Sequence, residues 1–283
     1  MVKVGCHISS AGGIYKVFER AKNVGAECIQ TFAGSPQVWK FPNYSDEDIA
    51  KFKVESAKYN IGPVFFHSIY LINLASENNA IRHGAINSLI KTWQLAEQLG
   101  IAGVITHTGS DNGRGFEVAL PMVKHSLEQI MTEIPKEAKS KLFLEIAAGA
   151  GGIIGDSIKE LGDIIKSVDS DERIGFALDT CHAFVSGYDL RVDEGINRLA
   201  SEIESEIGWE RLGAIHLNDS KGDLGSKKDR HEVVGQGYLG IETFNNLLHH
   251  RKFSQYPLIL ETPDIKSDVR DVPESLLIVK GMV

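Results

Sequence analysis

The chain has 283 residues, 42% of them hydrophobic and 24% charged, which is the composition of an ordinary globular protein with a large core. It contains neither a signal-peptide pattern nor an apolar run near the roughly 20 residues that span a bilayer, so we expect a cytoplasmic protein without a membrane partner. The three cysteines form no CxxC pair, which argues against a disulfide framework and against a cysteine-based zinc site. The net charge of −8 counts weakly against nucleic-acid binding, which usually needs a basic surface.

Eight short apolar runs recur along the whole chain. Most are hydrophobic at both alternating positions, which is the pattern of strands buried on both faces. The runs cover residues 2–7, 28–32, 63–67, 103–107, 141–146, 174–179, 212–217 and 257–261.

The segments between these runs have helical periodicity. Apolar residues recur on one helical face within residues 86–93, 120–130 and 158–165, and Ser45 followed by Asp46 and Asp48 indicates a capped helix start. Strands that alternate with helices indicate parallel strands joined by right-handed crossovers. Eight such units predict an α/β fold, a single (β/α)8 TIM-type barrel over residues 1–283.

The alternative is a doubly wound open sheet with a phosphate-binding glycine loop. No GxxxxGK[ST] motif occurs, and the glycines of residues 149–155 have the wrong spacing for GxGxxG. Residues 235–240 match GxGxxG, but they lie well beyond the seventh run and not directly after it. A plain turn is the better interpretation of that match, and the barrel is favoured.

Polar residues at and just beyond the ends of these runs are the most informative feature. In a barrel they would all lie at the C-terminal ends of the strands, where TIM-barrel active sites are built. Five of the ten histidines belong to this set, which consists of His67, His107, Glu145, Asp179, His182, His216, Asp229, His231 and Glu261.

Each of these residues has an ordinary structural interpretation when taken alone. A single histidine at a strand end is more often hydrogen-bonded than metal-bound, and a lone carboxylate is often a helix cap. Four carboxylates and five imidazoles in one cleft are different, because clustered carboxylates repel unless protons or cations neutralise them. Nitrogen and oxygen ligands without thiolate suit zinc, manganese or iron, and nine ligands would serve two or three ions. Clustered divalent metals favour phosphoester hydrolysis.

Five local motifs then reveal a resemblance. They are HISSAGG at 7–13, YLINLA at 70–75, LDTCH at 178–182, HLNDSK at 216–221 and DRH at 229–231. Together with the nine polar residues, they resemble the endonuclease IV family of apurinic/apyrimidinic endonucleases over essentially the whole chain. The family fold is a TIM-type barrel, in accord with the eight predicted strands.

The resemblance implies a DNA-repair endonuclease with three Zn²⁺ ions per chain. One ion would be held by His67, His107 and Glu145, a second by Glu145, Asp179, His216 and Glu261, and a third by His182, Asp229 and His231. Manganese or iron could replace zinc at one site. A metal-activated hydroxide would cut the backbone 5′ to an abasic site, with Glu145, Asp179 and Glu261 as catalytic residues, leaving a 3′-hydroxyl and a 5′-deoxyribose phosphate. The resemblance also implies removal of blocking groups from 3′ ends.

The expected partner is double-stranded DNA that contains abasic sites or blocked 3′ ends, and we expect a monomer. Tyr70 and Leu71 follow the third run and could wedge into the duplex from the minor groove. The alternative is that residues 70–72 start a core helix. The complete set of predicted DNA contacts is Ser9, Gln37, Tyr70, Leu71, Asn73, Lys221 and Arg230.

Two departures and the charge bear on this resemblance. Gln37 stands where some relatives have a basic residue, which weakens the case for a contact there, and residues 225–228 differ from the usual loop before Asp229. Three Zn²⁺ would add six positive charges to −8, giving −2, and they would lie where the phosphate binds.

Two rival functions stay open from the sequence. Glu145, Asp179, His216 and Glu261 alone would suit a metal-dependent sugar isomerase, but the other five ligands exceed its needs. An inert DNA-lesion binder that keeps the fold should have lost a ligand, and none is lost.

Overall fold

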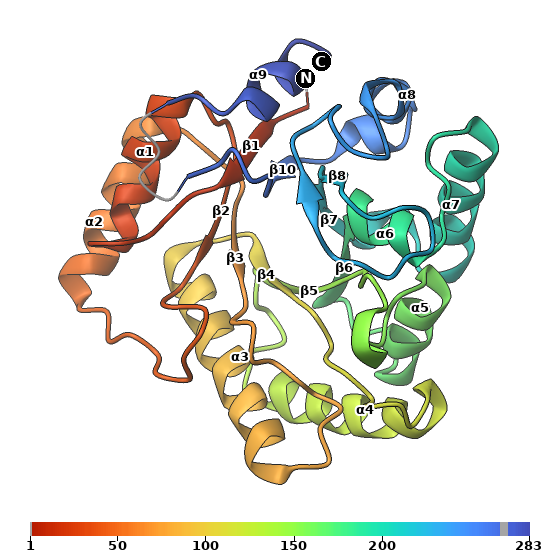
Figure 1. The fold of residues 1–283 in the computed structure, drawn as a ribbon. Helices are drawn as coiled ribbons and strands as arrows, with labels where there is room; N and C mark the ends of the chain where they lie inside the picture. Colours follow the sequence, from red (N-terminus) through yellow and green to blue (C-terminus); the bar gives the residue numbers. More distant parts are fainter. Residues whose placement is uncertain (1, 267–270) are drawn as a thin grey trace.

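The computed structural model describes residues 2–266 and 271–283, and its centre is a closed barrel of eight parallel strands (Figure 1). The strands follow the order β1-β10-β7-β6-β5-β4-β3-β2 around the barrel. The predicted fold is therefore confirmed, and each strand falls within one of the eight predicted runs. The strand bounds are β1 Val4–His7, β2 Ile29–Phe32, β3 Val64–His67, β4 Gly103–Thr106, β5 Lys141–Glu145, β6 Ile174–Asp179, β7 Leu212–His216 and β10 Leu258–Leu260.

The helices form an outer ring around the strands (Figure 1). They are α1 Val17–Val24, α2 Asp46–Tyr59, α3 Asn79–Leu99, α4 Phe116–Thr132, α5 Ile158–Ser167, α6 Thr180–Ser186, α7 Asp193–Glu206, α8 Ile241–His249 and α9 Glu274–Lys280, with short 3-10 turns η1 Ile14–Lys16, η2 Ala150–Gly152, η3 Trp209–Arg211 and η4 Phe253–Gln255. The predicted start of α2 is confirmed, because the side chains of Ser45 and Asp48 form a reciprocal capping box. Within residues 2–266 and 271–283, no helix is long and apolar enough to cross a membrane.

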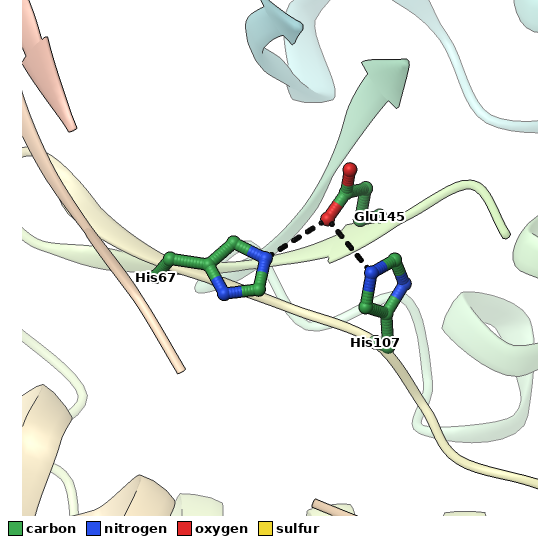
Figure 2. Close-up of side chains that lie close together, drawn as sticks. All are labelled: His67, His107 and Glu145. Carbon is green, nitrogen blue, oxygen red and sulfur yellow. Dashed lines mark hydrogen bonds and ion pairs between the residues drawn. The ribbon is translucent and has the colours of Figure 1, made fainter. Parts of the chain in front are cut away.

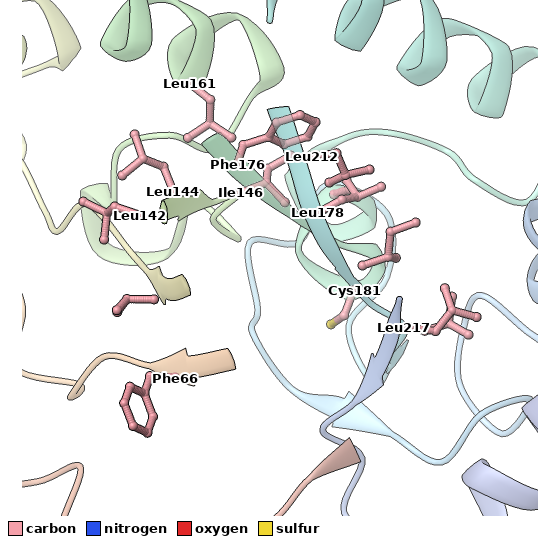
Figure 3. Close-up of a cluster of buried hydrophobic side chains, with 14 of the residues drawn as sticks. Phe66, Leu142, Leu144, Ile146, Leu161, Phe176, Leu178, Cys181, Leu212 and Leu217 are labelled. Atoms are coloured by element: carbon pink, nitrogen blue, oxygen red, sulfur yellow. The ribbon is translucent and has the colours of Figure 1, made fainter. Parts of the chain in front are cut away.

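Alternating side chains of each strand face the helices or the barrel interior, as β5 illustrates. Leu142 and Leu144 belong to the large core that lies between the strands and the helices, together with Phe176 and Leu178 of β6 (Figure 3). Phe143, between the two leucines, belongs instead to a small second cluster. The period of two in a strand thus explains why the predicted runs are hydrophobic at both parities.

The second cluster fills the inside of the barrel. Its largest side chains are phenylalanines, and the ring of Phe143 lies against glycines of β6 and β7. A Cβ added at Gly175 or Gly213 would lie 2.8 Å or 2.5 Å from that ring, so only glycine leaves room for it. The cluster consists of Cys28, Phe65, Ile105, Phe143, Ala177, Ala214 and Ile259.

A polar residue follows each member of this interior cluster two positions further along its strand. The same step leads from Gly5 to His7 on β1. Because side chains two apart lie on the same face of a strand, these eight residues face the same interior. The polar set consists of His7, Gln30, His67, His107, Glu145, Asp179, His216 and Glu261. The apolar interior therefore forms the floor beneath the predicted metal ligands.

The structure settles one alternative in the loops and adds one sheet that was not predicted. Residues 70–72 form a turn, so the alternative of a helix start there is wrong. A two-stranded antiparallel sheet of β8 (Asp219–Ser220) and β9 (His231–Glu232) pairs Ser220 with His231 and so fixes the loop that follows β7. The GxGxxG match is a turn, as expected, held by backbone N–H groups of Gly235, Gly237 and Leu239 that donate to the Asp219 carboxylate.

Candidate metal centre

Glu145 lies at the centre of a first ligand group with two histidines. Its Oε2 is 3.1 Å from His67 Nε2 and 3.4 Å from His107 Nε2, as Figure 2 shows. Ligand atoms of all three residues lie within 4.8 Å of one another, which is close enough for one ion to bind them together. Glu145 lies at the end of β5, His67 at the end of β3 and His107 directly after β4, so neighbouring strands bring the three residues together. Glu145 and His67 are buried.

The other oxygen of Glu145 takes part in a second group. Glu145 Oε1 is 2.8 Å from His216 Nδ1, and the same nitrogen lies 3.3 Å from Glu261 Oε2 and 3.9 Å from Asp179 Oδ2. Ligand atoms of these four residues also lie within 4.8 Å of one another. Glu145 thus faces two neighbouring groups, one with each oxygen, which is the arrangement of a bridging carboxylate.

A third group lies beside the second and is formed by residues of α6, of β9 and of the loop between β8 and β9. Asp229 Oδ1 is 3.2 Å from His182 Nε2 and 3.5 Å from His231 Nε2. His231 Nε2 is also 3.7 Å from Asp179 Oδ2, so Asp179 connects the third group to the second. The structure therefore brings the nine predicted ligands close together, in three groups with the same members as the three predicted sets.

Hydrogen bonds fix the orientation of the Asp179 carboxylate. Its Oδ1 accepts from the backbone N–H of His182 at 2.8 Å and caps α6, and its Oδ2 accepts from Asn218 Nδ2 at 2.7 Å. The Asn218 Oδ1 accepts from the backbone N–H of Glu261 at 2.8 Å. Asn218 is fully buried, and it therefore holds two of the four carboxylate residues in place.

The carboxylates and imidazoles of the cluster compensate one another electrostatically. Burial opposes ionisation of Glu261, but the charges of His216, His67 and His231 together outweigh it and lower the pKa of Glu261 to about 2. Burial also opposes charge on His216, yet Glu261 and Glu145 raise the pKa of His216 to about 9. Against the same cost of burial, Asp179 and Asp229 raise the pKa of His182 well above its usual value. Imidazolium protons thus reduce the repulsion expected among the carboxylates.

The donor set fits divalent cations. Among the described residues, three buried histidine nitrogens of this cluster have no hydrogen-bond partner: His107 Nδ1, His182 Nε2 and His231 Nε2. The latter two lie close to Asp229 Oδ1 without the angle of a hydrogen bond. A buried polar atom without a partner is costly, and a bound cation would satisfy those that face the ligand groups.

Cys181 lies near the third group but does not act as a ready ligand. Its Sγ shares a 4.8 Å neighbourhood with ligand atoms of Asp179 and His231. The side chain is fully buried, and burial followed by the charge of Asp179 raises the pKa of the thiol. A protonated thiol is a poor metal ligand, and Cys181 packs in the large apolar core instead.

A cavity of about 630 Å³ opens beside the second group. Its lining includes His7, Ser9, Tyr70, Glu261 and Lys266. The Tyr70 side chain is 65% exposed, and its ring meets Phe32 edge-on at 5.4 Å between centroids. Two of the predicted DNA contacts, Ser9 and Tyr70, therefore share one cavity with a predicted metal ligand.

The other predicted DNA contacts are more dispersed. Gln37, Lys221 and Arg230 are exposed, and Leu71 is half-buried. Lys221 Nζ lies 3.7 Å from Glu232 Oε2. Asn73 differs, because its amide accepts from the Ala75 backbone and donates to the Ser110 carbonyl, so both ends hold the loop. The contacts of Gln37, Leu71, Asn73, Lys221 and Arg230 with DNA stay predictions.

Sequence reasoning missed two buried amides at this centre, Asn218 and Gln30. Gln30 Nε2 donates to Glu261 Oε1 at 2.5 Å, and Gln30 Oε1 accepts from His216 Nε2 at 2.7 Å. A signal was present: Gln30 follows Cys28 by the same two-residue step that leads to six ligands on other strands. An amide is not a common metal ligand, so the residue type alone did not indicate a role at a metal centre.

Comparisons with known proteins agree on one group of relatives. A family model described as a xylose isomerase-like TIM barrel matches residues 18–280. The chain is 38% identical to a probable endonuclease 4 of Halothermothrix orenii, covering 96% of this chain and 97% of that protein. It is 41% identical to a probable endonuclease 4 of Petrotoga mobilis, with 93% and 92% covered. Apurinic-apyrimidinic endonuclease 1 of Saccharomyces cerevisiae is 38% identical, with 92% of this chain and 71% of that protein covered.

Two solved structures have folds similar to that of this chain. Endonuclease IV from Thermus thermophilus has a TM-score of 0.85 and 28% sequence identity, covering 99% of this chain and 98% of that one. A D-tagatose 3-epimerase-like protein has a TM-score of 0.74 at 19% identity, covering 99% and 97% of the two chains, and this likeness shows the shared fold alone.

Proposed function

The chain belongs to the endonuclease IV family, and on that premise we propose that it is a DNA-repair endonuclease that hydrolyses the phosphodiester bond 5′ to abasic sites. The observation that carries this proposal is the convergence of nine nitrogen and oxygen ligands into three adjoining groups at one end of the barrel. Relatives that share 35–41% of their residues with this chain have endonuclease names, which supports a nuclease over a sugar isomerase.

We propose that the three groups hold three Zn²⁺ ions, one in each. The first would be held by His67, His107 and Glu145, and the third by His182, Asp229 and His231; the second would be held by Glu145, Asp179, His216 and Glu261. Glu145 supports this assignment because its two oxygens face different groups. When bound, divalent ions lower the pKa of water and supply positive charge to the scissile phosphate and to the departing oxygen.

The protein's own residues position the three ligand groups. Glu145 and Asp179 are buried, and the carboxylate of each lies close to residues of two ligand groups. Their placement would fix the spacing of the groups across one phosphate. The apolar floor of the barrel keeps the site rigid, since close-packed interiors resist deformation. A phosphate would thus meet charges that are already in place, and such electrostatic preorganisation accounts for much of the rate enhancement of many enzymes.

We propose that the cavity beside Glu261 receives the sugar of the abasic nucleotide. A nucleotide without a base loses little stacking when it leaves the helix, so its extrusion costs little free energy. Tyr70, which lines this cavity and is largely exposed, would fill the gap left in the duplex. A phosphoester at a blocked 3′ end presents the same group to the same site, which supports a 3′-repair activity as well.

The proposal is tested with a duplex that carries one abasic site and a label on each end. The expected products have a 3′-hydroxyl and a 5′-deoxyribose phosphate, and an undamaged duplex of the same sequence is the control. Metal content is measured on the same sample: about three zinc per chain supports the nuclease. One or two manganese or magnesium ions, no cleavage and epimerisation of a ketose would instead support a sugar isomerase.

A further inference from the structure

We propose that Gln30 is a positioning residue of the second ligand group, which selects Nδ1 of His216 as the metal-binding nitrogen and aims the carboxylate of Glu261. This inference rests on the proposed metal centre. Gln30 lies on β2 and is fully buried. It is the residue that β2 contributes to the ring of polar side chains above the barrel floor, where six other strands contribute predicted ligands.

The amide of Gln30 is fully engaged by three side chains. Its Nε2 donates to Glu261 Oε1 at 2.5 Å and lies 3.2 Å from His7 Nδ1, and its Oε1 is 2.7 Å from His216 Nε2. These partners come from the first, seventh and eighth barrel strands or their ends. One neutral side chain therefore links His7 to two predicted metal ligands.

The chemistry of the partners fixes which way the amide faces. A carboxylate oxygen only accepts, so Glu261 must face the NH₂ group of Gln30. The amide oxygen then faces His216, and because that oxygen only accepts, His216 must carry a proton on Nε2. In a neutral imidazole the lone pair is then on Nδ1, the nitrogen that faces Glu145 and Glu261.

His216 differs from the other histidines of the centre in this respect. His67, His182 and His231 each have Nδ1 within hydrogen-bond distance of a backbone carbonyl, of Ser68, Ile146 and Glu261 respectively, and each presents Nε2 to a carboxylate. His216 has the reverse orientation, with Nδ1 toward the carboxylates. Backbone carbonyls fix the first three regardless of sequence, whereas the orientation of His216 depends on a side chain that can be replaced.

Replacing Gln30 with methionine removes the hydrogen bonds to Glu261, His216 and His7 while it keeps nearly the same side-chain length and volume. The adjacent Thr31→Val variant is a matched control, because Thr31 is fully buried on the same strand and its hydroxyl has no partner among the described residues. Zinc affinity is measured by competition with a chelator, and unfolding of the chelated proteins by heat reports any purely structural effect.

We expect Gln30→Met to weaken the binding of one zinc per chain by about 10–100-fold, the usual effect of losing a partner that orients a metal ligand. The zinc held by His67 and His107 should be affected much less. Thr31→Val should bind zinc as the unmodified chain does, and both chelated variants should unfold at similar temperatures. Wild-type zinc affinity in a folded Gln30→Met variant would overturn the inference.

A measurement on the unmodified chain covers the case in which Gln30→Met does not fold. In the zinc-loaded protein, nuclear magnetic resonance should find the His216 proton on Nε2, and a proton on Nδ1 would overturn the inference. The proposed function fails separately: a chain that binds zinc with the expected dependence on Gln30 but does not cleave abasic DNA would leave this inference standing and refute the nuclease.

Discussion

The Oδ1 atom of Asp179 accepts a hydrogen bond from the backbone N–H of His182 at 2.8 Å. Asp179 thereby caps the helix that carries His182, while its Oδ2 faces His216 in one ligand group and His231 in another. The two residues are three positions apart and belong to different groups, so this capped turn sets the spacing between the second and third predicted ions.

Asp179→Asn and His182→Ala should therefore have different effects on metal content. Asparagine can still cap α6, but it removes the negative charge shared by two ligand groups. Its NH₂ group would also face the NH₂ group of Asn218, so the hydrogen bond between these two side chains would be lost. We expect Asp179→Asn to lose zinc from the second and third groups, and His182→Ala to lose chiefly the third zinc. Elemental analysis after passage over a chelating resin measures this, and equal zinc loss from both variants would contradict the different roles.

The metal-free protein should become less stable as the pH rises above neutral. The pKa of His216 is raised from 6.5 to about 9, because Glu261 and Glu145 outweigh the cost of burial. The charged imidazole stabilises the fold fully below pH 6.5, and this contribution is lost as the pH rises to 9. A shift of this size corresponds to about 3 kcal/mol as an upper limit. Urea unfolding in the presence of a chelator measures it.

The zinc-loaded protein is the matched comparison for that experiment. A metal needs the neutral imidazole, so binding releases protons and becomes stronger at higher pH. Over the same range the zinc-loaded chain should keep or gain stability. A chelated chain whose unfolding free energy rises between pH 6.5 and 9 would show that His216 is not held in its charged form.

Tyr70→Ala should weaken binding of abasic DNA and leave the fold intact. An aromatic side chain that stacks in nucleic acid contributes about 1–3 kcal/mol, so affinity should fall by roughly 10-fold or more. The edge-on contact with Phe32 limits the loss of folding stability to about 1 kcal/mol. Fluorescence anisotropy with an abasic duplex measures the affinity.

Val54→Ala is the control, because it removes an apolar side chain that is 63% exposed on α2, and this variant should bind the duplex normally. Equal affinity of the Tyr70→Ala and Val54→Ala variants would show that Tyr70 does not contact the DNA.

Arg230→Ala should reduce the salt dependence of DNA binding. The Arg230 guanidinium is exposed and donates to the carbonyl of its own neighbour Asp229, so it is available to a phosphate. Loss of one phosphate contact should lower the slope of log K against log salt by about 1. Arg198→Ala on α7, which removes an exposed arginine paired with Glu202, is the control and should leave the slope unchanged. An unchanged slope for Arg230→Ala would contradict the phosphate contact.

The barrel and its ligand set were predictable because both follow from local patterns. Burial on both faces of each strand gives runs that can be counted, and strand ends are the places where a barrel presents polar side chains. The pattern of strand ends identifies His67, His107, Glu145 and Asp179 without any knowledge of their distances. Their meeting in three groups follows from closure of the barrel.

The remaining features depend on contacts that are distant in the sequence. The β8–β9 pair joins Ser220 to His231 across a loop, and no periodicity marks two-residue strands. Gln30 was missed because its role comes from partners on other strands and not from its own type. Asn73 was predicted to contact DNA, yet its amide holds residues 75 and 110, which only the loop conformation reveals.

Cleavage of a duplex with a single abasic site, measured with and without chelator for the unmodified chain and for Glu261→Gln, tests the metal-dependent nuclease most directly. Glutamine keeps the shape of Glu261 but removes the charge that faces His216 at 3.3 Å. The unmodified chain should cut 5′ to the abasic site, lose this activity on chelation and regain it with zinc, while Glu261→Gln should bind the duplex and cut it at least about 100-fold more slowly. Full activity of the chelated protein, or of Glu261→Gln, would contradict the proposed metal centre as the site of cleavage.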